Sequence, residues 1–412
     1  MINEDDSTEV KEELAEDGSK TGIEAELEEE VAIEPFDPDA ISIGQKVVPM
    51  DTLIRRLHQK TIKLSPTFQR NEVWDQTRKS RLIESLMLHI PLPMFYVAAN
   101  EEGRWEVVDG LQRLSTIRDF IIGDKDGVLL KLKNLEFLAD KFDGKTFIGI
   151  KGDPSQQKLV NDILETEMRF TVINPGTPEA VKRNIFKRIN TGGMPLTGQE
   201  IRHALYEGDS SKLLAKLANS VSFKIVMGGK VNDSRMGARE LILRFVSFLV
   251  FNREAYKGGM DSWLSNTMRV INCMSDLDPS RLNKIFLKDQ IPQIKITCVD
   301  EITERFELAM RRAEELFKGH EFRKSYPGDY RKSPINKSLF EIWSNVLSML
   351  SEEDYQKLLS RKKHLLKEYR IVLRSLDSTN SISRHSSTAK GILEGYADIS
   401  GVVNKIISGD YQ

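Results

Sequence analysis

Apolar residues follow two different patterns along this chain. Between residues 41 and 208, short apolar runs rich in β-branched and aromatic residues alternate with stretches whose apolar residues recur at helical spacing. Beyond residue 208 the helical spacing dominates. The pattern therefore predicts an α+β fold, with a small mixed sheet and helices in residues 41–208 and a mainly α-helical domain in residues 209–412.

Several elements of the first domain can be bounded from the pattern. Met94–Ala98 and Arg104–Val108 are predicted to be two strands joined by a turn at Asn100–Gly103, which makes a hairpin. The apolar stripe after Asp75 predicts a helix that this aspartate caps and that Pro91 ends. The other expected elements are a helix capped by Asp51, a small sheet with loops over 124–160, a strand over Glu167–Ile173, a helix from Pro178, and a helix begun by a capping box of Thr197 and Glu200.

The second domain is expected to consist of long helices. Residues 238–251, 296–317, 335–350 and 352–376 carry apolar residues at helical spacing, and a last short helix follows the Ser/Thr-rich stretch 375–388. No segment repeats with a period typical of solenoids. A mainly helical domain that is not a solenoid is therefore expected.

Charge is distributed unevenly along the chain. Residues 1–40 hold 16 Asp/Glu against 2 Lys/Arg, a charge of −14, whereas the remainder holds 58 Lys/Arg against 46 Asp/Glu, a charge of +12. The acidic stretch is poor in aromatic residues, so residues 1–40 are expected to form a disordered tail. A basic body suits a polyanion such as DNA, and the tail could compete for that surface or merely aid solubility.

Composition excludes several classes of protein. The 2 cysteines and 6 histidines are scattered without a metal or disulfide spacing, and the phosphate-binding motifs Gly-x-x-x-x-Gly-Lys-Ser/Thr and Gly-x-Gly-x-x-Gly are missing. The start of the chain is acidic, unlike a signal peptide, and the most apolar run, Leu241–Phe251, is too short to span a bilayer. A cytoplasmic protein without a membrane partner is expected.

One turn carries more polar chemistry than a connection needs. Val107-Val108 ends a predicted strand, a helix starts near Leu114, and Asp109-Gly110-Leu111-Gln112-Arg113 lies between them. A helix start presents unpaired N–H groups to an anion, and an arginine there adds a planar fork for phosphate oxygens. Asp109 could hold Mg²⁺ or accept a proton from water, and Gln112 could orient that water. The plain alternative is a helix cap with a local ion pair.

Two further segments could complete a phosphate site. In the first, Gln69 and Arg70 could bind phosphate while Phe68 or Trp74 offers a stacking face, or the aromatic pair could simply belong to the core. In the second, a helix end meets a new helix start across two glycines, which can form a concave anion site or a plain interhelix turn. The donors expected there are Arg188, Asn190, Thr191 and Gly192.

Taken together, the three segments resemble one family. Phe68-Gln-Arg-Asn-x-x-Trp74, Val107-Val-Asp-Gly-x-Gln-Arg-Leu-Ser-Thr116 and Phe186-x-Arg-Ile-Asn-Thr-Gly-Gly-x-Pro-Leu-x-x-Gln-Glu-Ile-Arg202 are similar to the N-terminal domain of GmrSD-type restriction endonucleases. The resemblance covers roughly residues 41–208 and implies a fold like that of ParB and sulfiredoxin. Asp109, Gly110, Gln112 and Arg113 fall on the family's Asp-Gly-Gln-Gln-Arg motif, with Leu111 in place of its first Gln.

The resemblance implies a function as well as a fold. It indicates a domain that binds and hydrolyses a nucleoside triphosphate with Mg²⁺, as a sensor or regulatory component of bacterial defence against foreign or modified DNA. The catalytic residues would be Asp109, Gln112 and Arg113. A His/Asn nuclease domain is not visible in this chain, so a separate nuclease partner is expected. The alternatives are a DNA- or partner-binding module that nucleotide only switches, and a nuclease in its own right; the oligomeric state stays open.

Overall fold

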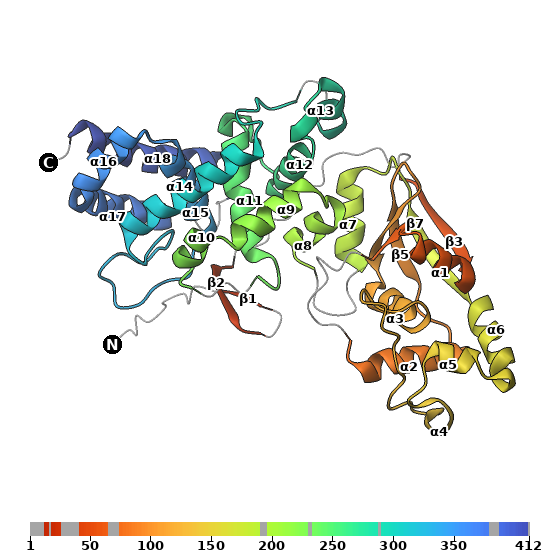
Figure 1. Ribbon diagram of the computed structural model, residues 1–412. Helices are drawn as coiled ribbons and strands as arrows, with labels where there is room; N and C mark the ends of the chain where they lie inside the picture. The colour runs from red at the N-terminus through yellow and green to blue at the C-terminus, as the bar shows by residue number, and fades with distance from the viewer. Residues whose placement is uncertain are drawn as a thin grey trace, which may run out of the picture. The chain divides into compact units, whose positions relative to one another are not determined.

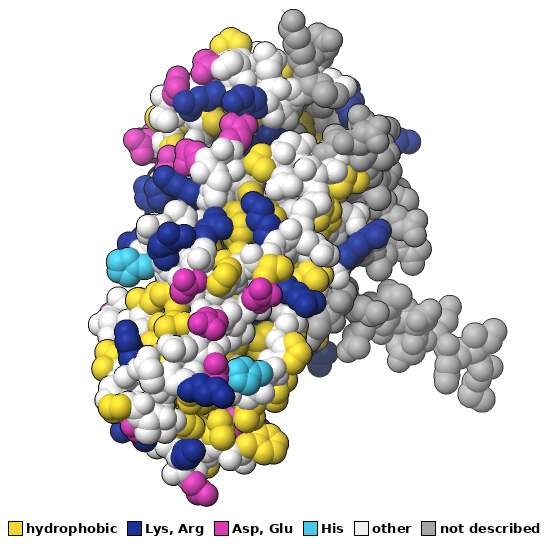
Figure 2. Space-filling view, turned by 90° about the vertical axis from the view of Figure 1, so that its right-hand side faces the viewer, with side chains coloured by type: hydrophobic (Ala, Val, Ile, Leu, Met, Phe, Trp, Pro, Cys, Tyr) yellow, Lys and Arg dark blue, Asp and Glu magenta, His cyan; other side chains and the backbone are white. Residues whose placement is uncertain are grey.

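The protein folds as two compact units, each with its own hydrophobic core. The computed structural model describes residues 12–15, 18–25, 41–64, 74–189, 196–229, 233–286, 290–378 and 387–410 (Figure 1). Residues 33–196 make up the N-terminal unit, and residues 1–32 together with 197–412 make up the helical unit. Among the described helices, none is long and apolar enough to cross a membrane. Figure 2 shows a face on which basic side chains are spread among acidic and apolar ones.

A five-stranded mixed sheet organises the N-terminal unit. Its strand order is β3-β7-β5-β6-β4, in which β3 pairs antiparallel with β7, β7 parallel with β5, β5 antiparallel with β6, and β6 parallel with β4. The strands are β3 (Ile43–Pro49), β4 (Ile62–Lys63), β5 (Phe95–Ala99), β6 (Trp105–Asp109) and β7 (Glu167–Ile173). The mixed sheet that the sequence predicts is confirmed.

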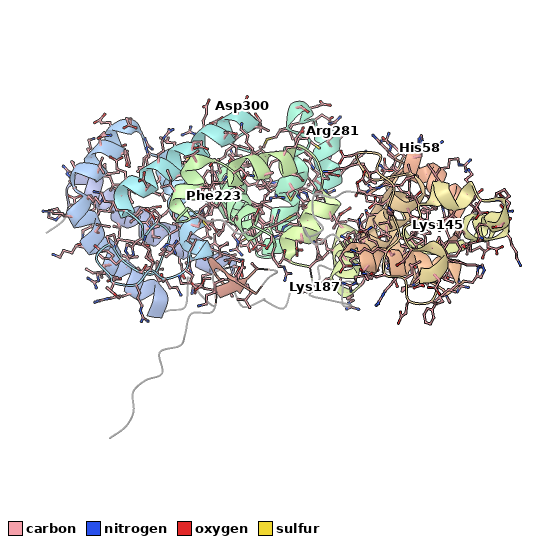
Figure 3. All side chains as sticks on the ribbon, turned by 60° about the horizontal axis from the view of Figure 1, so that its bottom comes forward. His58, Lys145, Lys187, Phe223, Arg281 and Asp300 are labelled. Carbon is pink, nitrogen blue, oxygen red and sulfur yellow. The ribbon has the colours of Figure 1, made fainter. Side chains whose placement is uncertain are left out.

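Helices pack against this sheet around one aromatic core. The ring of Phe170 lies 5.1 Å from that of Phe95 and 5.2 Å from that of Trp105, measured between centroids. Figure 3 labels His58 at the end of α1 and Lys187 on α7. The helices are α1 (Met50–His58), α2 (Gln76–Met87), α3 (Leu111–Ile121), α4 (Ala139–Phe142), α5 (Phe147–Lys151), α6 (Gln157–Glu165) and α7 (Glu179–Ile189).

The local predictions for this unit are largely confirmed, with two exceptions. The β5–β6 hairpin forms, and Asp75 caps α2 by accepting the Arg78 N–H at 2.7 Å. Residues 124–160 contain no strand, so the small sheet predicted there is wrong. The aromatic and aliphatic residues of that stretch enter the core from short helices and loops instead. Asp51 does not cap α1, because Pro49 takes the cap position and Asp51 lies inside the first turn.

A buried carboxylate ties the 124–160 stretch to α2. Glu84 of α2 is 3% exposed, and its two oxygens accept the backbone N–H groups of Glu136, Phe137 and Leu138 at 2.9, 2.7 and 2.8 Å. Burial alone would raise the pKa of Glu84, but the three N–H donors outweigh it and hold the pKa below its ordinary value. The charged form is therefore the one that the fold requires.

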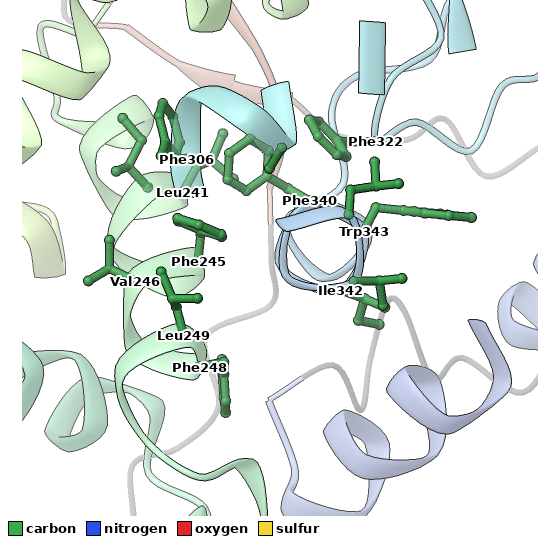
Figure 4. Close-up of a cluster of buried hydrophobic side chains, with 14 of the residues drawn as sticks. Leu241, Phe245, Val246, Phe248, Leu249, Phe306, Phe322, Phe340, Ile342 and Trp343 are labelled. Atoms are coloured by element: carbon green, nitrogen blue, oxygen red, sulfur yellow. The ribbon is translucent and has the colours of Figure 1, made fainter. Parts of the chain in front are cut away.

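The helical unit is built around α11 (Gly237–Val250), whose residues are buried on almost every side. Phe245 of this helix lies 5.5 Å from Phe306 of α14, between ring centroids (Figure 4). The helices are α8 (Gly198–Leu205), α9 (Asp209–Ala218), α10 (Val221–Val226), α11, α12 (Met260–Ile271), α13 (Pro279–Ile285), α14 (Val299–Phe317), α15 (Lys337–Met349), α16 (Glu352–Ser360), α17 (Lys362–Ser378) and α18 (Ala389–Ser408). The last helix, expected to be short, has 20 residues.

The boundary between the units lies before α8 rather than at residue 208. The predicted capping box forms, since the Thr197 hydroxyl accepts the Glu200 N–H at 3.1 Å. Arg202 of α8 is buried and bonds Glu240 of α11 at 2.9 Å and Asp261 of α12 at 2.5 Å. These ion pairs make α8 part of the helical unit. Because they join residues far apart in the sequence, the local sequence pattern does not predict them.

Part of the acidic N-terminal stretch is ordered, which differs from the disordered tail expected for residues 1–40. Strands β1 (Glu12–Leu14) and β2 (Lys20–Glu24) form a hairpin, and Ile23 is buried in the core of the helical unit. Glu13 bonds Lys337 at 2.6 Å, and Glu24 bonds Lys324 at 2.9 Å. The acidic residues are therefore neutralised by lysines that lie some 300 positions later in the sequence.

The hairpin should contribute to the stability of the helical unit. Ile23→Ala removes a side chain that is 1% exposed, so we expect the free energy of unfolding to fall by about 2–4 kcal/mol. Leu14→Ala in the same hairpin, where the side chain is 55% exposed, is the matched control and should change little. Urea denaturation followed by circular dichroism measures both. Equal effects of the two variants would contradict the docked hairpin.

Glu84 should make the stability of the N-terminal unit depend on pH. Glu84→Gln should cost about 2–3 kcal/mol at pH 7, because three N–H groups lose a charged acceptor. Since the folded-state pKa lies below the unfolded value, the stabilisation is full above about pH 5 and is lost as the pH falls through the folded pKa. Denaturation midpoints from pH 7 to 3 should therefore converge for wild type and variant. A constant gap would refute the assignment.

Candidate functional site

The Asp109–Arg113 turn joins the end of β6 to the start of α3 through a backbone shape that only glycine suits. Gly110 lies at φ 95° and ψ 14°, in the left-handed region, and is the N-cap of α3. A Cβ placed on Gly110 would lie 2.4 Å from Cδ1 of Phe95. Glycine is therefore required twice, by the backbone angle and by the close approach of β5.

Arg113 fastens this turn to the neighbouring strand. Its Nη2 donates to Oδ2 of Asp109 at 2.8 Å and to the carbonyl oxygen of Met94 at 3.3 Å, and its Nη1 donates to the carbonyl oxygen of Pro93. The guanidinium also lies 4.6 Å from the ring centroid of Phe95. Burial lowers the pKa of Arg113 below its ordinary value, and the charge of Asp109 opposes this shift. Arg113 is thus a partly buried side chain that links β5, β6 and α3.

Asp109 is the more accessible member of this ion pair. Its side chain is 35% exposed, against 12% for Arg113. Of the two charged groups, the carboxylate is therefore the more exposed to solvent. Among the described residues no side chain caps α3, so the first N–H groups of this helix lack a capping side chain there.

The two residues between Gly110 and Arg113 face in different directions. Leu111 is 4% exposed and belongs to the core of the N-terminal unit, so this departure from the family motif contributes packing. Gln112 is only partly buried, and its Oε1 accepts the backbone N–H of Trp74 at 3.4 Å. The amide therefore lies at the edge of the turn.

The hydrogen bond to Trp74 brings the end of the Phe68–Trp74 segment to the turn. The other flank of this segment is β4, which pairs with β6 through Ile62 opposite Trp105. Gln69 and Arg70 themselves lie outside the described residues. Because both flanks adjoin β6 and α3, the prediction that these two side chains serve the same site stands as a prediction.

The third predicted segment is described only in part. Arg188 is exposed near the C-terminal end of α7, beside Lys187 (Figure 3), whereas Arg113 is partly buried. Asn190, Thr191 and Gly192 lie outside the described residues. The structure therefore places Arg113 and Arg188 in different environments, and convergence of the arginines on one pocket stays a prediction.

The sequence did not predict which residues contact Arg113. The acceptors for Arg113 are the carbonyls of Pro93 and Met94, and the ring beneath it is Phe95. One signal was present, because the prolines in Pro91-Leu-Pro93 favour an extended backbone before β5. Such a segment leaves carbonyl groups free for a side chain, but the sequence does not say which one.

Comparison with known protein families supports the resemblance carried by these residues. Residues 52–207 match the family model described as the N-terminal domain of the GmrSD restriction endonuclease. This stretch is a GmrSD N-terminal domain. The matched range contains the turn, the Trp74 flank and α7, and it includes the whole of α8. Comparisons with curated proteins and with solved structures gave no match. The GmrSD domain associates the chain with restriction-type defence systems.

The turn of the GmrSD domain offers limited means to hold a metal. No group of three His, Cys, Asp or Glu side chains gathers among the described residues in a way that would bind an ion. Asp109 is a single, partly exposed carboxylate, with one oxygen bonded to Arg113. Mg²⁺ usually binds one or two carboxylates together with substrate phosphates. The residues present therefore fit Mg²⁺ only as an ion shared with a bound nucleotide.

The double requirement for Gly110 can be tested against a second left-handed glycine. Gly110→Ala adds a clash with Phe95 to the strain of positive φ, whereas Gly103→Ala in the β5–β6 turn adds strain alone, because nothing lies within 4 Å of its Cβ. The strain costs about 1–2 kcal/mol in each. We expect Gly110→Ala to lower the free energy of unfolding clearly more, measured by urea denaturation with tryptophan fluorescence. A loss no larger than that of Gly103→Ala would argue against the close approach.

Proposed function

We propose that the GmrSD domain binds a nucleoside triphosphate at the β6–α3 turn and hydrolyses it, as the sensor or regulatory component of a defence system against foreign or modified DNA. The observation that carries the proposal is the start of α3, which no side chain caps, beside a partly exposed carboxylate that the less exposed Arg113 holds in place. Helix starts of this kind bind phosphate groups through their N–H groups and partial positive charge.

Each residue of the turn has a distinct role in this proposal. Gly110 lets the backbone approach the phosphates without a side chain in the way. Asp109 accepts the proton of the attacking water, and Gln112 orients that water from the edge of the turn. Arg113 holds Asp109 in its place and spreads positive charge toward the transferred phosphoryl group. Arg113 thus acts as a positioning residue more than as a direct phosphate ligand.

The two partly described segments would supply the remaining contacts. The proposed nucleotide ligands are Gln69 and Arg70 from the segment between β4 and Trp74, and Arg188, Asn190, Thr191 and Gly192 from the end of α7. Should Asp109 instead hold Mg²⁺ together with the phosphates, the ion would supply neutralisation of phosphate charge. A separate nuclease would then carry out DNA cleavage.

Asp109 provides the sharpest test of hydrolysis. Asp109→Asn keeps the size of the side chain but removes the charge, so phosphate release from ATP, GTP, CTP or UTP should fall about 100-fold or more. Asp126→Asn, an exposed aspartate of the same unit, is the matched control and should leave the rate unchanged. Phosphate release by Asp109→Asn at the wild-type rate would disprove the site assignment.

A nucleotide-switched binding module is the second candidate. The observation that favours it is that Arg113 already donates hydrogen bonds to Asp109 and to two backbone carbonyls. Fewer of its N–H groups are therefore left to stabilise a transition state. The charge of +12 beyond residue 40 suits DNA, although Figure 2 shows basic groups spread among acidic ones on the face in view. Salt-dependent retention of DNA that nucleotide alters, without phosphate release, would favour this module over the hydrolase.

A further inference from the structure

Three cationic side chains lie close together in the helical unit. A cleft of about 210 Å³ opens between α17 and the segment that joins α14 to α15, which lie side by side in Figure 1. Three cationic side chains line this cleft against one carboxylate, and an aromatic and a leucine complete the wall. The lining residues are Lys324, Tyr326, Asp329, Arg370, Leu373 and Arg374.

The single carboxylate of the cleft, that of Asp329, accepts a backbone N–H group of the same loop. Asp329 accepts the N–H of Tyr326 at 2.7 Å, and the carbonyl of Tyr326 accepts the Asp329 N–H at 2.9 Å. Gly328, at φ 108°, allows the turn that this pair closes. Asp329 therefore shapes the loop and is oriented by it, which limits its ability to pair with the arginines opposite.

The two arginines stand one helical turn apart on the exposed side of α17. No carboxylate within the described part of the chain forms an ion pair with Arg370 or Arg374. Arg370 lies over the ring of Tyr326, with its guanidinium carbon 5.1 Å from the ring centroid. The aromatic face thus holds one guanidinium in place while its donors stay available. Two planar guanidinium groups that lie four residues apart on one helix can bind the oxygens of a phosphate group.

The other polar groups of the cleft fit the same ligand. The Tyr326 hydroxyl, whose pKa burial raises further, is protonated at neutral pH like any tyrosine and can donate a hydrogen bond. Lys324 adds a positive charge at the rim, where Glu24 of the N-terminal hairpin already bonds it at 2.9 Å. The volume is below the range usual for pockets of drug-sized ligands, which points to a small anionic group.

We propose that this cleft is a phosphate-binding site, separate from the nucleotide site of the GmrSD domain. Its ligand is the phosphate group of a phosphorylated molecule, held by the guanidinium groups of Arg370 and Arg374 with the Tyr326 hydroxyl as a further donor. The phosphate can come from a small phosphate ester or from a DNA backbone. Glu24 couples the cleft to the acidic start of the chain, because it shares Lys324 with the ligand.

Binding to the full-length protein tests the site. Isothermal titration calorimetry with pyrophosphate is one arm, and fluorescence anisotropy with a short DNA duplex is the other. Arg370→Gln/Arg374→Gln should weaken binding at least tenfold in the arm that carries the true source of phosphate. Both side chains are exposed, so the fold should be kept. Lys363→Gln/Lys367→Gln removes two charges from exposed positions of the same helix that do not line the cleft, and should have little effect.

The outcomes separate a specific site from general charge. A loss confined to the arginine variant supports the cleft, and the arm that shows it names the ligand as a small phosphate or as DNA. Loss of the Tyr326 donor in Tyr326→Phe should weaken the same binding by a smaller factor. Equal losses in the arginine and lysine variants would show that only net charge matters and would overturn the proposal. So would the absence of binding in both arms.

Discussion

The N-terminal unit depends on one largely buried guanidinium, whose side chain is 12% exposed. Arg113 joins the start of β5, the end of β6 and the first turn of α3 through two carbonyls, one carboxylate and one aromatic face. These four contacts fix where the chain turns from strand to helix, and they decide that the helix start is open. The close approach of Phe95 explains why Gly110 precedes this helix. Stability and candidate chemistry therefore rest on the same group, which is why a change at Arg113 would alter both.

The helical unit depends instead on a network of buried charges that joins distant parts of the chain. Glu240 lies between Lys337 and Arg202. Burial alone would raise the pKa of Glu240, but the positive charges of these two side chains outweigh it and lower the pKa. Glu13 from the N-terminal hairpin extends the network by bonding Lys337 as well. Breaking such a pair leaves an uncompensated buried charge, so the network defines one arrangement of the helices more than it adds stability. The start of the chain is thereby built into a unit whose helices begin at residue 198.

The two proposed anion sites use different physical means. At the β6–α3 turn the positive potential comes from backbone N–H groups, and the arginine stays behind the carboxylate that it holds. In the cleft beside α17 it comes from exposed guanidinium groups and a tyrosine. The first arrangement suits a reaction, because a positioned carboxylate would stand beside a phosphate bound at the turn. The second suits recognition, because its groups bind phosphate without an activated acid or base.

Local sequence determined most of the elements. Alternation and turn residues predicted the β5–β6 hairpin and β7, and side-chain caps predicted the starts of α2 and α8, because these signals act within a few residues. The polar turn from Asp109 to Arg113 was also visible as a motif. Tertiary structure decided the rest. Within residues 124–160, the N–H groups of residues 136–138 bond Glu84, and the acidic hairpin forms ion pairs with Lys324 and Lys337. Such long-range pairings leave no local pattern, so only the folded chain shows which side chains meet.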